Sequence, residues 1–263
     1  MGRIPLIAAN WKMYKTPKES LAFLEAFLPL VKEHTRDEIA IFPTMSSLGY
    51  VLDATRGSKV NAGAQNMHWL DEGPYTGQTS PTMLAAIECK HVLIGHSERR
   101  IYANETDETV NLKLKAAFSH GLNPILCVGE AIEKRQVGLT AAVLRWQITC
   151  ALNGMGRDAC HDLLVAYEPV WAIGTGSTAT PQQAQEAHWI IRTEIAAHLG
   201  TDCADRTRIL YGGSVKPENI SSLMAQSDID GALIGGASLD PHTFFKIVTY
   251  NASEKQQLSI SAN

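Results

Sequence analysis

The stretch VAYEPVWAIGTG, residues 165–176, begins like the interior of a β-sheet and ends like a hinge. Its first apolar run stops at a carboxylate, Glu168, and Pro169 and a second apolar segment lead from there to Gly-Thr-Gly. The end of a buried strand is an unfavourable place for a charge, because removing a carboxylate from water costs free energy. The stretch therefore predicts a buried strand whose carboxyl end carries a side chain that serves chemistry rather than stability.

The same organisation recurs along the 263 residues, where short apolar runs alternate with segments typical of helices. Two of those segments begin with capping boxes that place proline at the first helical position, at 16–19 and 180–183. Apolar strands that alternate with helices predict a parallel sheet covered by helices, so the fold class is α/β. The eight runs are IPLIAAN (4–10), EIAIFP (38–43), KVNAGAQ (59–65), HVLIGH (91–96), NPILCVG (123–129), DLLVAYE (162–168), RILYGG (208–213) and GALIGG (231–236).

Eight such units are the number that a closed (β/α)8 barrel requires, and about 250 residues is the usual size of that fold. A doubly wound open sheet remains an alternative, because the same alternation of strands and helices builds it. No change in composition, flexible linker or block of charge marks a domain boundary. We therefore expect a single (β/α)8 barrel domain over residues 1–263, with a polar C-terminal tail from about 251.

The charge balance excludes some classes of partner. With 23 Lys and Arg against 27 Asp and Glu, the formal net charge is -4, which provides no basic field for nucleic acid or an anionic membrane. No apolar run is long enough to span a bilayer, and the run at the N-terminus is too short for a signal peptide. Five scattered cysteines without a C-x-x-C pair fit a reducing compartment. We therefore expect a cytoplasmic protein without nucleic-acid or membrane partners.

The segment NMHWLDEGPYTGQT, residues 66–79, is long for a connection between a strand and a helix. Aromatic side chains on a protruding loop favour contact with another protein. Alternatively, Trp69 and Tyr75 fold back onto the rim of the barrel. Of the two interpretations, we expect the interface.

Polar residues gather where the predicted strands end. Asn10 and Lys12 close the first strand, His96 and Glu98 the fourth, and Glu168 the sixth. Taken singly, the lysine is as readily a surface charge and the histidine a hydrogen-bonded core residue. In a parallel barrel, however, the carboxyl ends of all strands lie on one face, so these side chains share one mouth. Their joint placement predicts an acid/base site.

We expect neither a metal nor a dinucleotide at this mouth. No H-E-x-x-H motif occurs, and His91 and His96 would point to opposite faces of one strand. The sequence GTGSTA (174–179) is not placed directly between a strand and a helix, as a dinucleotide fingerprint requires, and no P-loop motif occurs. The glycines at 212–213 and 235–236 follow the last two strands, where barrels of this kind often bind phosphate through backbone N–H groups.

Six motifs, in order, resemble the triosephosphate isomerase family over essentially the whole chain. They are NWKM (10–13), GHSERR (95–100), CVGE (127–130), YEPVWAIGTG (167–176), YGGSV (211–215) and IGGASL (234–239). The resemblance implies a TIM barrel that forms a homodimer through the loop 66–79. It also implies an isomerase of glycolysis and gluconeogenesis, without a cofactor, that interconverts dihydroxyacetone phosphate and D-glyceraldehyde 3-phosphate through an enediol.

The resemblance further implies a role for each site residue. Glu168 would be the base that moves a proton between two carbons, and a neutral His96 would polarise the carbonyl and shuttle protons between the oxygens. Asn10 and Lys12 would stabilise the developing oxyanion. The other implied residues are Glu98 and Cys127 as supports of the site, Gly174, Ser214, Gly235 and Gly236 for the phosphate alongside Asn10 and Lys12, and Thr76 for contact with the partner subunit.

Elementary acid–base chemistry agrees with these roles. A free glutamate has a pKa of about 4.3, whereas a base works best with a pKa of ~6–7. An apolar flap of residues 170–173, hinged at Pro169 and at 174–176, would expel water and raise the pKa of Glu168 by about two units. A helix that begins after His96 would disfavour its imidazolium form.

The loop departs from the family at two positions. Pro74 and Gln78 stand where the family usually has Ala and Glu, and Gln78 lacks a charge that could contact Arg99. The resemblance therefore does not fix the affinity of the dimer. Two other functions stay open from the residues: an aldolase in which Lys12 forms a Schiff base, and a phosphosugar-binding protein without catalysis.

Overall fold

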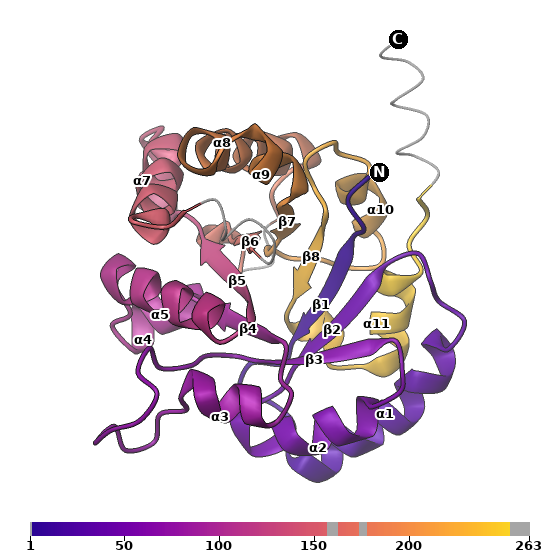
Figure 1. The fold of residues 1–263 in the computed structure, drawn as a ribbon. Helices are drawn as coiled ribbons and strands as arrows, with labels where there is room; N and C mark the ends of the chain where they lie inside the picture. The colour runs from indigo at the N-terminus through magenta and orange to yellow at the C-terminus, as the bar shows by residue number, and fades with distance from the viewer. Residues whose placement is uncertain (1, 157–162, 174–177, 253–263) are drawn as a thin grey trace.

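The computed structural model describes residues 2–156, 163–173 and 178–252. Eight parallel strands form a closed barrel in the order of the sequence, and helices surround it (Figure 1). The first strand pairs with both the second and the eighth, which closes the sheet. The predicted (β/α)8 barrel is confirmed, and the open-sheet alternative is wrong. The strands are β1 (Leu6–Asn10), β2 (Glu38–Phe42), β3 (Val60–Ala64), β4 (His91–Ile94), β5 (Asn123–Val128), β6 (Leu164–Tyr167), β7 (Arg208–Tyr211) and β8 (Gly231–Ile234).

The helices begin where the sequence places their caps. The hydroxyl of Thr16 accepts the N–H of Glu19, and the hydroxyl of Thr180 accepts that of Gln183, so both predicted capping boxes form. The α-helices are α1 (Pro17–Val31), α2 (Met45–Thr55), α3 (Pro81–Ala86), α4 (Ser97–Tyr102), α5 (Asp107–Ser119), α6 (Ile132–Gln136), α7 (Thr140–Leu152), α8 (Pro181–Leu199), α9 (Thr201–Arg206), α10 (Ile220–Met224) and α11 (Pro241–Val248). Two short 3-10 turns, η2 (Val170–Ala172) and η3 (Gly236–Ser238), follow β6 and β8.

Alternation along the strands divides the core into two parts. Leu93, Ile125 and Leu210 help to fill the inside of the barrel, while their neighbours in sequence pack outward against the helices. Because both faces of the sheet are buried, the strands are apolar almost without interruption. The packed interior makes the barrel a rigid support for the loops at its carboxyl ends.

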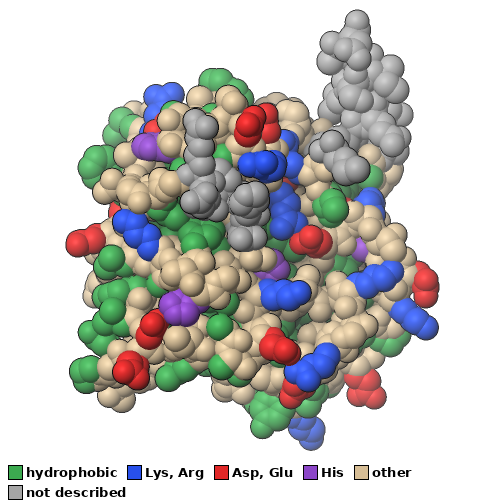
Figure 2. Space-filling view, viewed as in Figure 1, with side chains coloured by type: hydrophobic (Ala, Val, Ile, Leu, Met, Phe, Trp, Pro, Cys, Tyr) green, Lys and Arg blue, Asp and Glu red, His purple; other side chains and the backbone are tan. Residues whose placement is uncertain are grey.

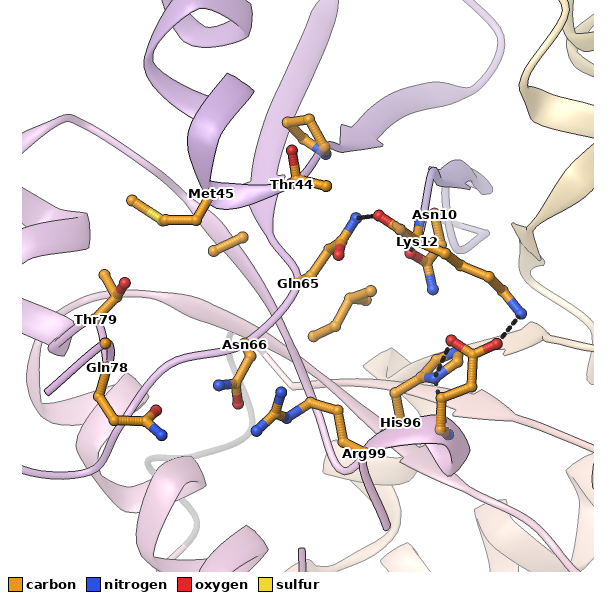
Figure 3. Close-up of a pocket in the computed structure, with 15 residues that line it drawn as sticks. Asn10, Lys12, Thr44, Met45, Gln65, Asn66, Gln78, Thr79, His96 and Arg99 are labelled. Atoms are coloured by element: carbon orange, nitrogen blue, oxygen red, sulfur yellow. Dashed lines mark hydrogen bonds and ion pairs between the residues drawn. The ribbon is translucent and has the colours of Figure 1, made fainter. Parts of the chain in front are cut away.

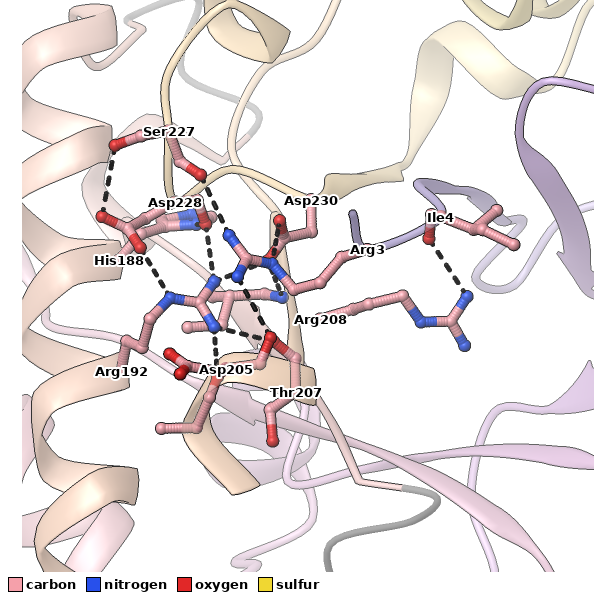
Figure 4. A network of polar contacts seen from close by, with 12 residues as sticks. Arg3, Ile4, His188, Arg192, Asp205, Thr207, Arg208, Ser227, Asp228 and Asp230 are labelled. Carbon is pink, nitrogen blue, oxygen red and sulfur yellow. Dashed lines mark hydrogen bonds and ion pairs between the residues drawn. The ribbon is translucent and has the colours of Figure 1, made fainter. Parts of the chain in front are cut away.

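A network of ion pairs fixes the opposite end of the barrel, where strands β7 and β8 begin (Figure 4). Arg192 of α8 lies 2.6 Å from a carboxylate oxygen of Asp228 and 2.6 Å from one of Asp230. Arg3, close to the N-terminus, lies 2.6 Å from the other oxygen of Asp230. Removal of one partner from a buried network of this kind is strongly destabilising, because an uncompensated charge remains. The network therefore ties the start of the chain and α8 to the start of β8.

The described cysteines differ in oxidation state. Cys89, Cys127 and Cys150 are free, whereas Cys203 is disulfide-bonded. The scattered spacing of the cysteines did not predict this bond.

Two surface properties agree with the composition. In the described ranges no helix is both long and apolar enough to cross a membrane. Acidic and basic side chains are interspersed over the face drawn in Figure 2, as the small net charge suggests.

Candidate active site

The carboxyl ends of the strands surround a cavity of about 720 Å³. Residues that follow β1, β4, β6, β7 and β8 line it, as the joint placement of polar residues predicts. A second cavity, of about 260 Å³, adjoins it and shares four of its residues, Asn10, Lys12, His96 and Glu98 (Figure 3). The predicted site residues that line the larger cavity are Asn10, Lys12, His96, Glu98, Glu168, Ser214, Gly235 and Gly236.

Glu168 comes directly after β6, and its side chain is only 2% exposed. One carboxylate oxygen, Oε2, accepts the backbone N–H of Ser97 at 2.8 Å. The other, Oε1, lies 2.8 Å from Nε2 of His96. The carboxylate and the imidazole predicted to do the chemistry are therefore direct neighbours.

This contact sets the protonation of the pair. Burial by itself raises the pKa of Glu168, but the charge of His96 and the hydrogen bonds from His96 and Ser97 outweigh it, and the carboxyl pKa lies below its usual value. Burial lowers the pKa of His96, but Glu168 outweighs that effect and raises it, so the expectation that the imidazolium form is disfavoured is wrong in this arrangement. In this arrangement the expectation of a raised pKa at Glu168 is wrong, because the sequence did not reveal that His96 contacts the carboxylate directly.

His96 is the N-cap residue of α4, as the expected helix start requires. Its Nδ1 accepts the backbone N–H of Glu98 at 3.2 Å. A proton on Nδ1 would break that hydrogen bond, so a neutral ring carries its proton on Nε2. Nε2 is the atom that faces Glu168.

Lys12 is held in an unusual backbone conformation, with a φ of 51°. Non-glycine residues visit this left-handed region at a cost of roughly 1–2 kcal/mol, so the surrounding contacts must stabilise it. The Lys12 N–H donates to Oδ1 of Asn10 at 3.0 Å, and Nε2 of Gln65 donates to the Lys12 carbonyl at 2.8 Å (Figure 3). Its ammonium lies 2.5 Å from Oε1 of Glu98. These contacts fix a positive charge at the mouth of the barrel.

The expected phosphate side of the cavity lies next to this lysine. A Cβ on Gly235 would lie 3.2 Å from Cε of Lys12, so the lysine side chain passes close to the backbone at the end of β8. Ser214 lies in a turn that Asn219 closes, since Nδ2 of Asn219 donates to the Ser214 carbonyl and its Oδ1 accepts the N–H of Lys216. Gly174, the remaining residue expected at the phosphate, lies outside the described residues.

Cys127 and Thr76 are the predicted residues that do not line the larger cavity. Cys127 is fully buried on the inner face of β5, and burial holds the pKa of its thiol well above the ordinary value. Thr76 is exposed on the loop 66–79, which extends away from the barrel between β3 and α3 in Figure 1. Along the same loop, Trp69 packs against the core, as the second interpretation of these aromatics expects, and Tyr75 stays exposed; contact of the loop with another protein stays a prediction.

Sequence reasoning missed two residues near the site. Gln65 closes the run KVNAGAQ, and its position at a strand end is the same signal that identified the other site residues. Glu130 lies within the motif CVGE and is 1% exposed. It accepts hydrogen bonds from the hydroxyl of Tyr167 and from Nε1 of Trp171, in the predicted flap. A buried carboxylate of this kind gives no periodic signal in the sequence.

Fold and site together define a class of protein, a (β/α)8-barrel enzyme with an acid/base pair, a fixed ammonium and glycine-rich strand ends. No group of three or more potential metal ligands lies close together within the described part of the chain.

Comparison with known proteins identifies the family. The family model described as "Triosephosphate isomerase" matches residues 5–251. Proteins of that name are 50% identical to this chain in Solibacter usitatus, 51% in Carboxydothermus hydrogenoformans and 50% in Clostridium perfringens. Each match covers 94% of this chain and at least 98% of the relative. The chain belongs to the triosephosphate isomerase family.

The enzyme is accordingly an aldose–ketose isomerase of glycolysis, which interconverts dihydroxyacetone phosphate and D-glyceraldehyde 3-phosphate. The aldolase and the non-catalytic binding protein are therefore not its main activity.

Proposed function

We propose that Glu168 is the base of this isomerisation. It would take the proton from the carbon beside the carbonyl and return it to the neighbouring carbon, while Nε2–H of His96 donates to the carbonyl oxygen. The observation that carries the proposal is the position of both groups, 2.8 Å apart and together at the wall of one cavity. A substrate bound between them would separate the carboxylate from the imidazole. The effect of burial on the Glu168 pKa would then dominate and make the carboxylate a stronger base.

The oxyanion that forms during this transfer would be stabilised by Lys12 and Asn10. The Lys12 ammonium is already oriented by Glu98, and its backbone N–H by the Asn10 amide. Preorganised donors of this type are worth roughly 3–4 kcal/mol each in transition-state stabilisation. An aldolase would need a free, uncharged amine at Lys12, and the ion pair with Glu98 opposes that chemistry.

The phosphate would bind to backbone N–H groups at Gly235, Gly236 and Ser214, with Gly174 of the flap completing the site. These described positions line the cavity on the side of Lys12. Closure of the flap would exclude water and retain the reactive enediol, so less phosphate would be lost from it. Cys127 would support the floor of the site as a neutral thiol beneath Glu168.

The decisive experiment compares wild type with Glu168→Gln, which keeps the shape of the side chain and removes its basicity. In D2O, wild type should exchange the transferred hydrogen of dihydroxyacetone phosphate with solvent, and the variant should not. Binding of a non-reacting phosphate analogue should persist in the variant. Exchange at the wild-type rate in Glu168→Gln would refute its role as base. Borohydride reduction with substrate should leave Lys12 unmodified.

We also propose a homodimer in which the loop 66–79 enters the partner subunit's smaller cavity. In support, the ring of His68 stacks on Trp69 at 4.0 Å and packs at a tilt against Tyr75 at 4.3 Å between ring centroids, so the loop makes contacts within itself that hold its shape. Met13 and Tyr102, 91% and 82% exposed, surround the mouth of the barrel. Thr76→Arg should shift sedimentation from dimer to monomer and lower activity. An unchanged dimer would contradict this assembly.

One folded domain in the cytoplasm fits these features. Three of the described cysteines are free, which suits a reducing compartment, whereas the disulfide at Cys203 is more typical of an oxidising one. A single cooperative unfolding transition of the whole chain would support one domain, and enzyme activity in the cytosolic fraction of its own cells would support the location.

A further inference from the structure

Gln147 of α7 makes two hydrogen bonds to a single residue, Gly129, directly after β5. Its Oε1 accepts the Gly129 N–H at 2.8 Å, and its Nε2 donates to the Gly129 carbonyl at 3.2 Å. The pairing of β4 with β5 ends at Ile94 and Leu126, so Gly129 lies beyond the reach of the neighbouring strand. The side-chain amide of Gln147 thus makes the hydrogen bonds to the Gly129 N–H and carbonyl that a neighbouring strand would otherwise make.

The peptide that Gln147 holds lies against the backbone of Glu168. A Cβ on Gly129 would overlap the Glu168 carbonyl oxygen and lie 3.2 Å from its Cα, so the two backbones are in direct contact. On either side of this contact, the Glu168 N–H donates to the Val128 carbonyl at 2.7 Å and the Val170 N–H donates to the Glu130 carbonyl at 3.1 Å. The end of β5 therefore determines where the backbone of Glu168 and the start of η2 lie.

We propose that Gln147 is a positioning residue for the base. It touches neither the cavity nor the Glu168 carboxylate; it fixes the Gly129 peptide on which the backbone of Glu168 rests. This inference depends on the proposed role of Glu168. A shift of 1 Å at a reacting group costs ~100-fold in rate, and loss of a supporting residue allows a smaller shift. We expect a roughly tenfold decrease in kcat when Gln147 can no longer bond Gly129.

Two substitutions and a control test the proposal. Gln147→Met keeps the length of the side chain and removes both hydrogen bonds, while Gln147→Glu retains an acceptor for the Gly129 N–H and loses the donor to its carbonyl. The control is Thr149→Val on the same helix, because Thr149 bonds Glu194 of α8 and not Gly129. For each protein, kcat, KM, the melting temperature and the kinetic isotope effect with dihydroxyacetone phosphate deuterated at the reacting carbon are measured.

A positioning role predicts that Gln147→Met lowers kcat about tenfold with KM within about twofold, and that the isotope effect increases because proton transfer becomes slower. The kcat of Gln147→Glu should lie between those of Gln147→Met and wild type. If Gln147→Met fails to fold, the kcat and isotope effect of Gln147→Glu decide whether Gln147 has a positioning role. Thr149→Val should alter the melting temperature only. Wild-type kcat and isotope effect in both Gln147 variants would overturn the inference, as would losses equal to those of Thr149→Val.

Glu168→Gln, assayed in parallel, separates the two proposals. If Glu168→Gln loses activity and the Gln147 variants do not, Glu168 remains the base and Gln147 has no positioning role. If Glu168→Gln stays active, the role of Glu168 fails, and the inference about Gln147 fails with it.

Discussion

Nε2 of His96 and Oε1 of Glu168 lie 2.8 Å apart, and both side chains are almost completely buried. Two groups so close titrate as a pair, so a proton gained by one changes the affinity of the other. The same contact stabilises the carboxylate and weakens it as a base. If Glu168 is the base, as we propose, the substrate would come between the two, and the length of the Glu168 side chain would decide whether it can still reach the reacting carbon.

Glu168→Asp tests that length. The shorter side chain withdraws the carboxylate by about 1 Å, which should lower kcat on the order of 100-fold while KM changes little. A coupled isomerase assay measures both constants. Glu38→Asp is the matched control, because Glu38 is a carboxylate at the opposite end of the barrel, where it pairs with Arg208. Near-normal turnover in Glu168→Asp would count against Glu168 as the base.

Glu98→Gln should show that the charge of Glu98 orients Lys12. The amide keeps the size and hydrogen-bonding capacity of the side chain but removes the ion pair with the ammonium. Because both side chains are partly exposed, the stability should change by less than ~1 kcal/mol. We expect kcat/KM to decrease by roughly tenfold, as one oriented donor to the oxyanion weakens. A large decrease in melting temperature with unchanged kcat/KM would contradict this view of Glu98.

A hydrogen bond joins the predicted flap to the residues that follow β5. Nε1 of Trp171, in the flap, donates to Glu130 at 3.0 Å. The guanidinium of Arg135 lies over the same indole, 4.6 Å from its centre. Trp171→Phe keeps an aromatic ring for Arg135 and removes the donor to Glu130. The flap should then close less often, and more free phosphate should appear per turnover, because the enediol is exposed to water. Phosphate release equal to that of the control Trp189→Phe, an exposed tryptophan on α8, would refute the link.

Most of the barrel could be predicted from the sequence, because alternation of apolar runs with capped helices is a local property. The strand ends can be aligned for the same reason, so the sequence alone predicts that Lys12, His96 and Glu168 lie at one mouth of the barrel. The direction of the Glu168 pKa could not be predicted. It depends on an interatomic contact with His96, 72 residues away in sequence, that periodicity cannot resolve.

The residues that support the site without contacting the cavity could not be predicted from the sequence either. Gln147 lies on a helix with no special pattern, and only the structure shows that its amide reaches Gly129. Gln65 had a visible signal, a polar residue at a strand end, and its role in holding the Lys12 carbonyl became clear from the geometry.

Protonation of His188 should make the folded protein less stable at acidic pH. It is fully buried in α8 beside the rings of Tyr167 and Tyr211, and burial lowers its pKa to about 4. Its Nδ1 lies 3.1 Å from the carbonyl oxygen of Asp228, so the neutral ring can donate there. The buried Nε2 has no hydrogen-bond partner among the described residues, and a proton at this atom would introduce an uncompensated charge.

The direction of this pH dependence follows from which state of the chain, folded or unfolded, binds the extra proton at His188. Between its unfolded pKa of about 6.5 and its folded pKa of about 4, His188 is protonated in the unfolded chain and neutral in the folded one. The stability is therefore fully present above pH ~6.5 and declines as the pH falls toward 4, by up to ~1.4 kcal/mol per pH unit for this one group.

His188→Gln retains a donor for the Asp228 carbonyl and has no titratable ring. Urea unfolding at pH 7, 6 and 5 should give a shallower decline for His188→Gln than for wild type, whereas His242→Gln, on the exposed side of α11, should follow wild type. Identical slopes in wild type and His188→Gln would show that the unfolded state gains no proton at this position relative to the folded one.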